Sequence, residues 1–376
     1  MSACKDKYQW CKDEPSVYKD GKGNKYCVFH APRGNKAGSS LADFNERVFA
    51  RIDRAKSEKK ACVLSGTVFE GDIDFNRYDK DNPLPEIHFS YATFSGKAHF
   101  LGATFSGEAN FESAIFSGEA VFFGATFSDK AYFLNATFSD KAYFLNAIFS
   151  DEADFSLVKF NGGAYFVSES FDKDAGKKGV FKMRANFNNV FAKEKVKFER
   201  VNLKEVFFLD SDLRNCDFVN CYWQKQGGRE VLYDEVLLFS EKGKGVLGKL
   251  KRWFLSLKHR DAERIAKVGT LYRNLKQKNV DEHNWPEVSN WHYGEKEMYR
   301  KGSGFRRFFP LTISNLYWFF GGYGERPVRA GAWLGVFILA ISVLMGFTCF
   351  EPSPESYGYE GIIEKPLAYL INTLQY

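Results

Sequence analysis

Residues 126–147 read TFSDKAYFLNATFSDKAYFLNA, in which the eleven residues Thr126–Ala136 are followed at once by an identical copy. The phenylalanines of this stretch recur at alternating intervals of five and six residues, and the alternation continues far beyond it. Such a regular interval indicates a structural repeat. The positions that follow it are Phe89, Phe94, Phe100, Phe105, Phe111, Phe116, Phe122, Phe127, Phe133, Phe138, Phe144, Phe149, Phe155, Phe160, Phe166 and Phe171.

An alanine lies two places before every repeat phenylalanine from Phe94 to Phe155. Residues two apart lie on the same side of an extended strand, so each unit presents one large and one small apolar side chain together. An eleven-residue period also fits a right-handed coiled coil. The recurring Ser-Gly, Ser-Asp, Leu-Gly and Leu-Asn steps oppose a helix and favour turns between short strands. The pattern therefore predicts a β-solenoid.

Units such as Ala92-Thr-Phe-Ser-Gly96 resemble those of pentapeptide-repeat proteins, which carry Leu or Phe at the centre and a small residue two places before it. A later run keeps a strict interval of five, with Phe198, Leu203, Phe208, Leu213 and Phe218. The resemblance implies a mainly β fold, a right-handed quadrilateral β-helix over residues 62–228, with four units per coil. The sixteen phenylalanines then make four coils. An earlier coil is expected near Phe69 and Phe75, with interruptions at 82–86 and 172–179.

The first thirty residues contain Cys4, Cys11, Cys27 and His30 in the pattern C-x6-C-x15-C-x2-H. Three thiolates and one imidazole form a common tetrahedral zinc set, and the closing Cys-x2-His is a good knuckle spacing. Pentapeptide-repeat proteins with membrane tails begin with a similar segment. We therefore expect residues 1–40 to hold a structural zinc ion, against the alternative of three ordinary thiols near a disordered terminus. Residues 41–61 are expected to form a helical linker or cap.

Residues 229–307 are predicted to form a basic helical region. From Glu241 to Arg307 there are 17 basic and 8 acidic residues. Lys242–Arg260 holds seven basic residues and no acid, and its apolar residues share one face of a helix. Such a helix can lie on anionic lipid, or it can cap the open end of the solenoid with a solvated basic face. Both interpretations stay open, and both can hold.

Ala330–Phe350 contains no charge over 21 residues. As a helix it spans roughly 31 Å at about 1.5 Å per residue, enough to cross a bilayer. Arginines precede it and glutamates follow it, so the positive-inside rule predicts a single-pass protein of the inner or plasma membrane with cytoplasmic N-terminal domains. The alternative is a core helix of a soluble protein. Within residues 308–329, the stretch Phe308–Gly322 is apolar and aromatic but short and ends in glycine, which favours an interfacial or re-entrant segment over a second full span.

The tail, residues 351–376, is similar in Leu367–Tyr376 to the start of the pore helix of an ion-channel-like module found in membrane-tailed relatives. No Gly-rich filter and no second apolar span follow it here. One such chain is therefore not expected to build a conducting pore in the usual way. A relic, a truncated chain and association with a partner in the membrane remain open explanations.

No paired-carboxylate, nucleophile-elbow or phosphate-loop motif is present, so we expect a non-enzymatic protein. Met1–Tyr26 lacks the apolar core of a signal peptide, which agrees with a reducing cytoplasmic location for the seven cysteines. The leading hypothesis is a membrane-anchored scaffold for an unknown protein partner. The alternatives are a regulatory part of an ion-channel-like protein and a DNA mimic that protects topoisomerases. Acids exceed bases only mildly in the repeats, so no nucleic-acid role is expected, and oligomerisation stays open.

Overall fold

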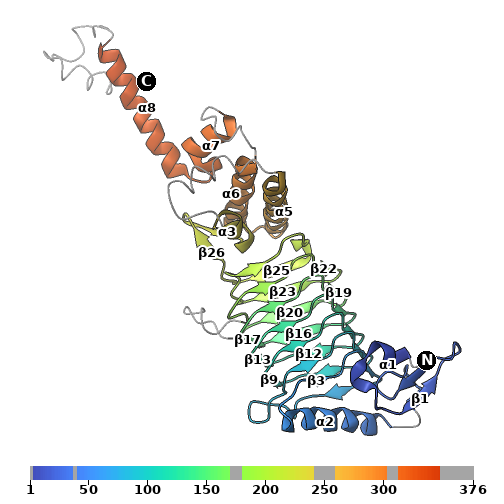
Figure 1. Ribbon diagram of the computed structural model, residues 1–376. Helices are drawn as coiled ribbons and strands as arrows, with labels where there is room; N and C mark the ends of the chain where they lie inside the picture. The colour runs from blue at the N-terminus through green and yellow to red at the C-terminus, as the bar shows by residue number, and fades with distance from the viewer. Residues whose placement is uncertain (1–2, 37–39, 170–179, 241–258, 303–311, 348–376) are drawn as a thin grey trace, which may run out of the picture.

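The computed structural model describes residues 3–36, 40–169, 180–240, 259–302 and 312–347. A four-sided β-solenoid forms the middle of the molecule, with the N-terminal segments at one end and a set of helices at the other (Figure 1). This arrangement confirms the expected solenoid followed by helices. The expected loop 172–179, the basic segment Lys242–Arg260 and the tail 351–376 lie outside the described residues.

Each side of the solenoid is a parallel sheet of very short strands, one from each coil. Face 1 stacks β3 (Cys62–Val63), β6 (Ile87–His88), β10 (Ala109–Asn110), β14 (Ala131–Tyr132), β18 (Ala153–Asp154), β21 (Ala185–Asn186) and β24 (Val206–Phe207). Face 2 stacks β4 (Val68–Phe69), β7 (Thr93–Phe94), β11 (Ile115–Phe116), β15 (Thr137–Phe138), β19 (Lys159–Phe160) and β22 (Phe191–Ala192). Face 3 stacks β5 (Ile73–Asp74), β8 (Ala98–His99), β12 (Ala120–Val121), β16 (Ala142–Leu145), β20 (Ala164–Val167), β23 (Val196–Glu199) and β25 (Cys216–Val219). Face 4 stacks β9 (Thr104–Phe105), β13 (Thr126–Phe127) and β17 (Ile148–Phe149).

The repeat phenylalanines from Phe89 to Phe166 fill the axis of the solenoid, where they are buried. Each ring stacks on its counterpart in the next coil, as for Phe100 and Phe122, whose centroids lie 4.7 Å apart with an interplanar angle of 1°. Rings from opposite faces meet edge to face, as for Phe122 of face 3 and Phe133 of face 1 at 5.6 Å and 90°. Both arrangements suit the quadrupole of an aromatic ring. The alanines two places earlier are buried as well, so the large and small side chains form alternating layers.

The alternation of five and six residues reflects two kinds of corner. In each five-residue interval from Phe89 to Phe160, one residue adopts a left-handed backbone, such as Tyr91 with a φ of 58° and Gly102 with a φ of 65°. In the six-residue intervals from Phe94 to Phe155, the extra residue makes the turn without positive φ. The later five-residue intervals Leu203–Phe208 and Leu213–Phe218 contain no positive φ, so the left-handed residue accompanies the short corner of the regular run without being required for a five-residue unit.

The first described coil is closed across the expected interruption at 82–86. Leu84 is fully buried and bridges to Phe105, so it takes the inward position on face 4 that a phenylalanine takes in later coils. In the fifth coil this position belongs to Phe181, whose ring stacks on Phe149 at 5.3 Å. Phe171, which the repeat spacing predicts for that position, lies outside the described residues.

The N-terminal end of the solenoid is covered by α2 (Leu41–Ser57). Ser40 caps this helix through a reciprocal capping box with Asp43. On its buried face Phe44 meets Phe69 at 6.0 Å between ring centroids, and Phe49 meets Phe75 at 5.9 Å. Beside it lie α1 (Ala3–Lys7), a 3-10 turn (Gln9–Cys11) and the antiparallel strands β1 (Ser16–Lys19) and β2 (Lys25–Cys27).

At the other end, the last coil includes a 3-10 turn (Leu213–Asn215) and leads into an antiparallel hairpin, β26 (Gln224–Gln226) and β27 (Arg229–Val231). The expected solenoid boundary at residue 228 falls inside this hairpin, which the repeat spacing does not predict. The helices α3 (Tyr233–Ser240), α5 (His259–Asp281) and α6 (Trp285–Gly302) follow. Trp223 and Trp291 meet edge to face at 5.2 Å and cover the end of the phenylalanine core.

The last described elements are α7 (Ile313–Gly321), a 3-10 turn (Gly322–Gly324) and α8 (Pro327–Phe347). Helix α8 extends away from the rest of the molecule (Figure 1). Its residues Pro327–Leu344 have a mean hydropathy of 1.8, and only 6% of them are buried. Among the described residues, this is the one helix long and apolar enough to cross a membrane. It begins three residues before the expected span, and residues 348–350 of that span lie outside the described part.

Candidate functional sites

The four predicted metal ligands come together at the N-terminal end of the solenoid. The ligand atoms of Cys4, Cys11, Cys27 and His30 all lie within 4.8 Å of one another, and all four residues are buried. Cys27 Sγ is 3.1 Å from His30 Nδ1. The 3-10 turn supplies Cys11, and the turn after β2 supplies His30. The backbone N–H of Cys27 also points at Cys4 Sγ, at 3.3 Å.

The orientation of His30 is fixed by the first coil of the solenoid. His30 Nε2 lies 3.0 Å from the carbonyl oxygen of Ser65, so it carries the proton and donates, which leaves Nδ1 as the electron-pair donor facing the thiols. A carbonyl acceptor behind a histidine ligand is a frequent device of metal sites. The same carbonyl accepts Trp10 Nε1–H at 3.1 Å.

Two further contacts hold the cysteine segment on the solenoid. The backbone N–H of Val68 donates to the carbonyl of Phe29 at 2.8 Å, in the way that Thr93 donates to Thr67 one coil later. The turn after Cys27 is therefore hydrogen-bonded as if it belonged to a coil before the first. Lys36 is buried, and its ammonium donates to the carbonyl of Val28 at 2.5 Å, which fixes that turn from inside.

These residues fit a tetrahedral zinc ion. Three sulfurs and one imidazole nitrogen are the usual donors of a closed structural site. In the metal-free protein, burial and then the neighbouring Cys27 raise the pKa of the Cys11 thiol, so a cation is needed to hold three thiolates there. Burial lowers the pKa of His30 to about 4, which keeps the imidazole neutral and able to ligate.

Sequence analysis predicted these four residues from their spacing and missed the groups around them. The aromatic rings of Tyr8 and Trp10 flank His30, with Tyr8 stacked on its imidazole at 4.4 Å and an interplanar angle of 5°. Their position between two predicted ligands was a usable signal. The sequence gives no signal for the role of Ser65, because Ser65 contributes a backbone carbonyl that every residue has.

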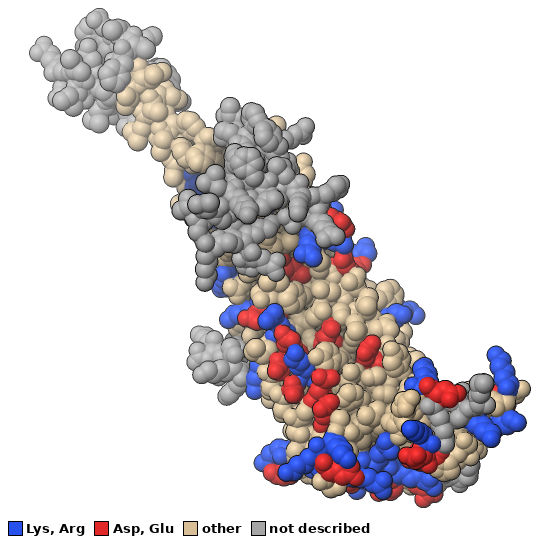
Figure 2. Space-filling view, in the orientation of Figure 1, with Lys and Arg blue, Asp and Glu red and all other residues tan. Residues whose placement is uncertain are grey.

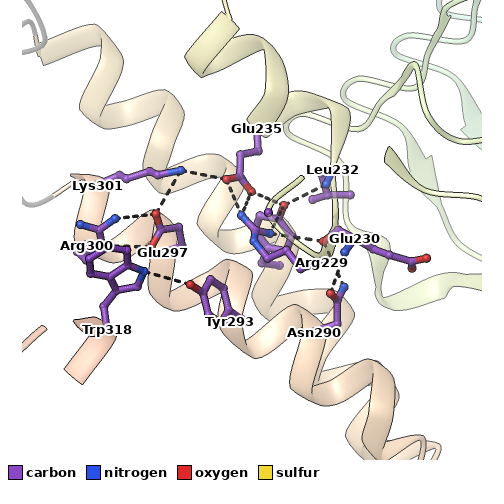
Figure 3. A network of polar contacts seen from close by, with 12 residues as sticks. Arg229, Glu230, Leu232, Glu235, Asn290, Tyr293, Glu297, Arg300, Lys301 and Trp318 are labelled. Carbon is purple, nitrogen blue, oxygen red and sulfur yellow. Dashed lines mark hydrogen bonds and ion pairs between the residues drawn. The ribbon is translucent and has the colours of Figure 1, made fainter. Parts of the chain in front are cut away.

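The joint between the solenoid and α8 is a network of buried charges (Figure 3). Glu235 of α3 is fully buried, and both its oxygens accept from Arg229 Nη2 at 2.6 Å. The same carboxylate accepts Tyr272 O–H at 2.6 Å and pairs with Lys301 at 3.1 Å. Three helices and the hairpin thus meet at one carboxylate.

A second carboxylate continues this network toward α7 and α8. Glu297 pairs with Arg300 at 2.7 Å and accepts Tyr323 O–H at 3.0 Å. Burial raises the pKa of Glu297, but Arg300 and Lys301 outweigh it, and the net result is a lowered pKa. The ionised form is therefore kept. At the base of α8, Arg329 donates to the carbonyl of Trp318 at 3.1 Å.

A family model for pentapeptide repeats, in nine copies, matches residues 89–127 and 122–168. Residues 89–168 of the solenoid are pentapeptide repeats. No curated protein and no solved structure matches the chain.

The pentapeptide-repeat solenoid carries one line of apolar side chains on its outside, at the corner between faces 3 and 4. We call it the apolar ladder, and it consists of Leu101, Phe123, Leu145 and Val167. Successive members are joined by backbone hydrogen bonds of adjacent coils, such as Gly124 N–H to Leu145 O at 2.8 Å. Leu101 is 48% exposed and Phe123 is 38% exposed. Exposed apolar side chains that adjoin one another often mark contact sites, so this line is a candidate contact surface.

Proposed function

We propose that this chain is a non-enzymatic scaffold, fixed to a membrane by α8, whose pentapeptide-repeat solenoid binds a protein partner. The observation that carries the proposal is the exposure of α8. Leu334 is 62% exposed, Leu339 55% and Leu344 66%, on a helix without charges after Arg329. Figure 2 shows the described part of this helix as a tan column with hardly any charged residues. Lipid is the solvent that matches such a surface.

The test of membrane anchoring is alkaline carbonate extraction of membranes from cells expressing the full chain. We expect the protein to stay in the membrane pellet. Leu339→Arg, near the middle of α8, should release a large share of it, because an arginine at the bilayer centre costs roughly 3 kcal/mol. The matched control is Val328→Arg, at the exposed start of the same helix. Full release of the unchanged protein would reject the anchor.

We propose that the solenoid side of α8 faces the cytoplasm. Arg326 and Arg329 lie at the start of this helix, which is the distribution that the positive-inside rule associates with the cytoplasmic side. A membrane-impermeant thiol or lysine label applied to intact cells tests this orientation. The solenoid lysines should be labelled only after the cells are opened.

We propose zinc as the ion held by the four N-terminal ligands, in a structural role. The purified chain should contain one zinc per protein, and Cys27→Ser should lose it. The control is Cys216→Ser, since Cys216 is a buried thiol of face 3 far from the four ligands in sequence. Chelation should lower the melting temperature of the unchanged protein and leave that of Cys27→Ser where it is.

We propose the apolar ladder as the surface that the protein partner contacts. A photo-crosslinking residue in place of Phe123 should give one discrete product in cells. The control position is Ile115, which is 42% exposed on face 2, a different side of the solenoid. Equal products from both positions, or none from Phe123, would reject this surface.

A further inference from the structure

A cavity of about 310 Å³ lies where the last coil of the solenoid meets α5 and α6. Phe218, Trp223, Leu275 and Trp291 form its apolar part. The rest of its lining is polar, with Asn220, Cys221, Glu230, Asn279, Asn284 and Glu287. This volume is at the lower end of the roughly 300–1,000 Å³ typical of small-molecule sites.

The two carboxylates of this cavity form no ion pair among the described residues, although Lys225 lies opposite Glu230 in the β26–β27 hairpin. Within the part of the chain that the structure describes, no ion pair or side-chain hydrogen bond is formed by the carboxylate of Glu230 or Glu287. In Figure 3 the Glu230 side chain extends away from the Arg229–Glu235 network, and no dashed line reaches its carboxylate. Its backbone is held in place, because Glu230 N–H donates to Asn290 Oδ1 at 3.0 Å.

Burial raises the pKa of Glu287, and the nearby negative charge of Glu230 raises it further. Burial also raises the pKa of Glu230, against a smaller opposite effect of Lys225. Two acids of like charge in one half-buried cavity repel each other, and a cation between them would relieve that repulsion.

The apolar wall is suited to the same kind of ligand. Trp223 and Trp291 are nearly buried, with 5% and 2% of their surface exposed, and they meet at the floor of the cavity. Indole rings attract organic cations more strongly than other aromatic rings do. The amides of Asn279 and Asn284 are linked to each other at 3.1 Å and add hydrogen-bonding capacity at the rim.

We propose that this cavity binds a small organic cation of the alkylammonium class, with its charge at Glu230 and Glu287 and its alkyl chain against Trp223 and Trp291. A bare metal ion is a poorer match, because four of the ten lining side chains offer no ligand atom. The cavity joins the solenoid to the helices that lead to α8, so a bound cation would contact both parts at once.

The test uses the full chain in detergent micelles and butylammonium as the probe, followed by ligand-observed NMR. 1-Butanol serves as an uncharged analogue of the same length. We expect saturable binding of butylammonium, with an affinity on the order of millimolar for so few atoms, and at least tenfold weaker binding of 1-butanol. Equal binding of the two compounds would show a plain apolar cavity and overturn the proposal. Absence of saturable butylammonium binding would overturn it as well.

Variants locate the binding. Glu287→Gln and Glu230→Gln keep the shape of the side chain and remove its charge, and each should weaken butylammonium binding at least fivefold. The matched control is Glu263→Gln, an exposed acid on α5 that pairs with Lys267 at 3.4 Å and lies outside the cavity. Unchanged binding in both cavity variants would overturn the proposal. The melting temperatures of all variants are recorded, and if one cavity variant fails to fold, the other decides.

Discussion

The carboxylate of Asp234 accepts the backbone N–H of Phe208 at 3.1 Å, at the place where a further coil would offer a carbonyl. In the coils before it, the N–H of Phe155 donates to the carbonyl of Asn186 at 2.7 Å, and that of Phe187 to the carbonyl of Phe207 at 2.8 Å. A side chain from the first turn of α3 thus ends face 1 by replacing the next strand. It satisfies a buried donor that the last coil would otherwise leave without a partner.

Replacing Asp234 by alanine should therefore lower the stability of the last coils. Loss of the acceptor leaves the Phe208 N–H buried and unsatisfied, which costs about 1–3 kcal/mol. Asp234→Asn keeps an amide oxygen and should cost less than Asp234→Ala. The measurement is the midpoint of urea unfolding for both variants. Equal midpoints for the two variants would contradict the capping role.

The stability contributed by Asp234 should depend on pH. Burial raises the pKa of this carboxyl from 3.8 to about 6 in the folded protein. A raised folded-state pKa gives a contribution that is complete below pH 4 and is lost as the pH rises through 6. The loss amounts to roughly 3 kcal/mol for a shift of this size.

The comparison of the unchanged protein with Asp234→Asn isolates this effect, since the other groups titrate alike in both. The difference in their unfolding free energies should fall between pH 4 and pH 6 and stay level above. A difference that does not change with pH would refute the assignment to Asp234.

Two neighbouring phenylalanines should respond very differently to truncation. Phe122 is fully buried on the solenoid axis, while Phe123 belongs to the apolar ladder. Phe122→Ala should cost about 3–5 kcal/mol through lost burial and a cavity between stacked rings. Phe123→Ala should cost less than about 1 kcal/mol. Thermal unfolding of the two variants checks this, and similar losses would be inconsistent with the inward and outward assignment.

Gly66 should be required for docking the cysteine segment on the solenoid. Its φ is +73°, and a Cβ at this position would lie 2.2 Å from the ring of Tyr8. Gly102 has a similar φ of +65° but open space around it. Gly66→Ala should therefore destabilise the protein more than Gly102→Ala, because the backbone strain is shared and only the first adds a clash. Melting temperatures measure the difference, and a larger effect at Gly102 would count against the contact.

The buried charges of the joint should matter more than exposed ones. Arg229→Ala removes the guanidinium nitrogen from which both oxygens of the fully buried Glu235 accept, and leaves Lys301 and Tyr272 as its partners. We expect a loss at the lower end of the roughly 3–5 kcal/mol typical of breaking a buried pair. Arg214→Ala removes a similar pair with Asp212 whose side chains are 69% and 48% exposed, and should cost about 1 kcal/mol at most. Urea unfolding of both variants decides, and comparable losses would indicate that the network adds little.

The solenoid could be predicted from the sequence because the pattern that indicates it is local and repeated. The pairing of an alanine with a phenylalanine two places later, as in Ala92 and Phe94, recurs every five or six residues, so the same inference can be drawn from many units. The regular spacing failed to predict two inward positions on face 4, because an unexpected residue fills each of them. Leu84 does so after five residues of irregular loop, and Phe181 does so on the far side of residues 170–179.

The candidate site was predictable where side-chain chemistry is distinctive. Cys27 and His30 have a spacing that few other roles require, whereas Ser65 acts through its backbone. The hairpin β26–β27 could have been predicted, since Gly227 and Gly228 are adjacent and both adopt positive φ. The buried role of Glu235 could not have been predicted. One acid of a short helix gives no sign that Arg229, Tyr272 and Lys301 surround it in the folded protein.

The two kinds of corner have a consequence for the length of this protein. Eleven residues, with one left-handed corner and one longer corner, complete half a coil, so the identical copies Thr126–Ala136 and Thr137–Ala147 lie on opposite sides of the axis. Inserting one more such copy would rotate everything after it by half a turn, and α8 would leave from the other side. Inserting two copies would keep every direction and move the cysteine segment about 4.8 Å farther from α8. The solenoid is thus a spacer whose length can change in steps of 22 residues without altering what either end faces.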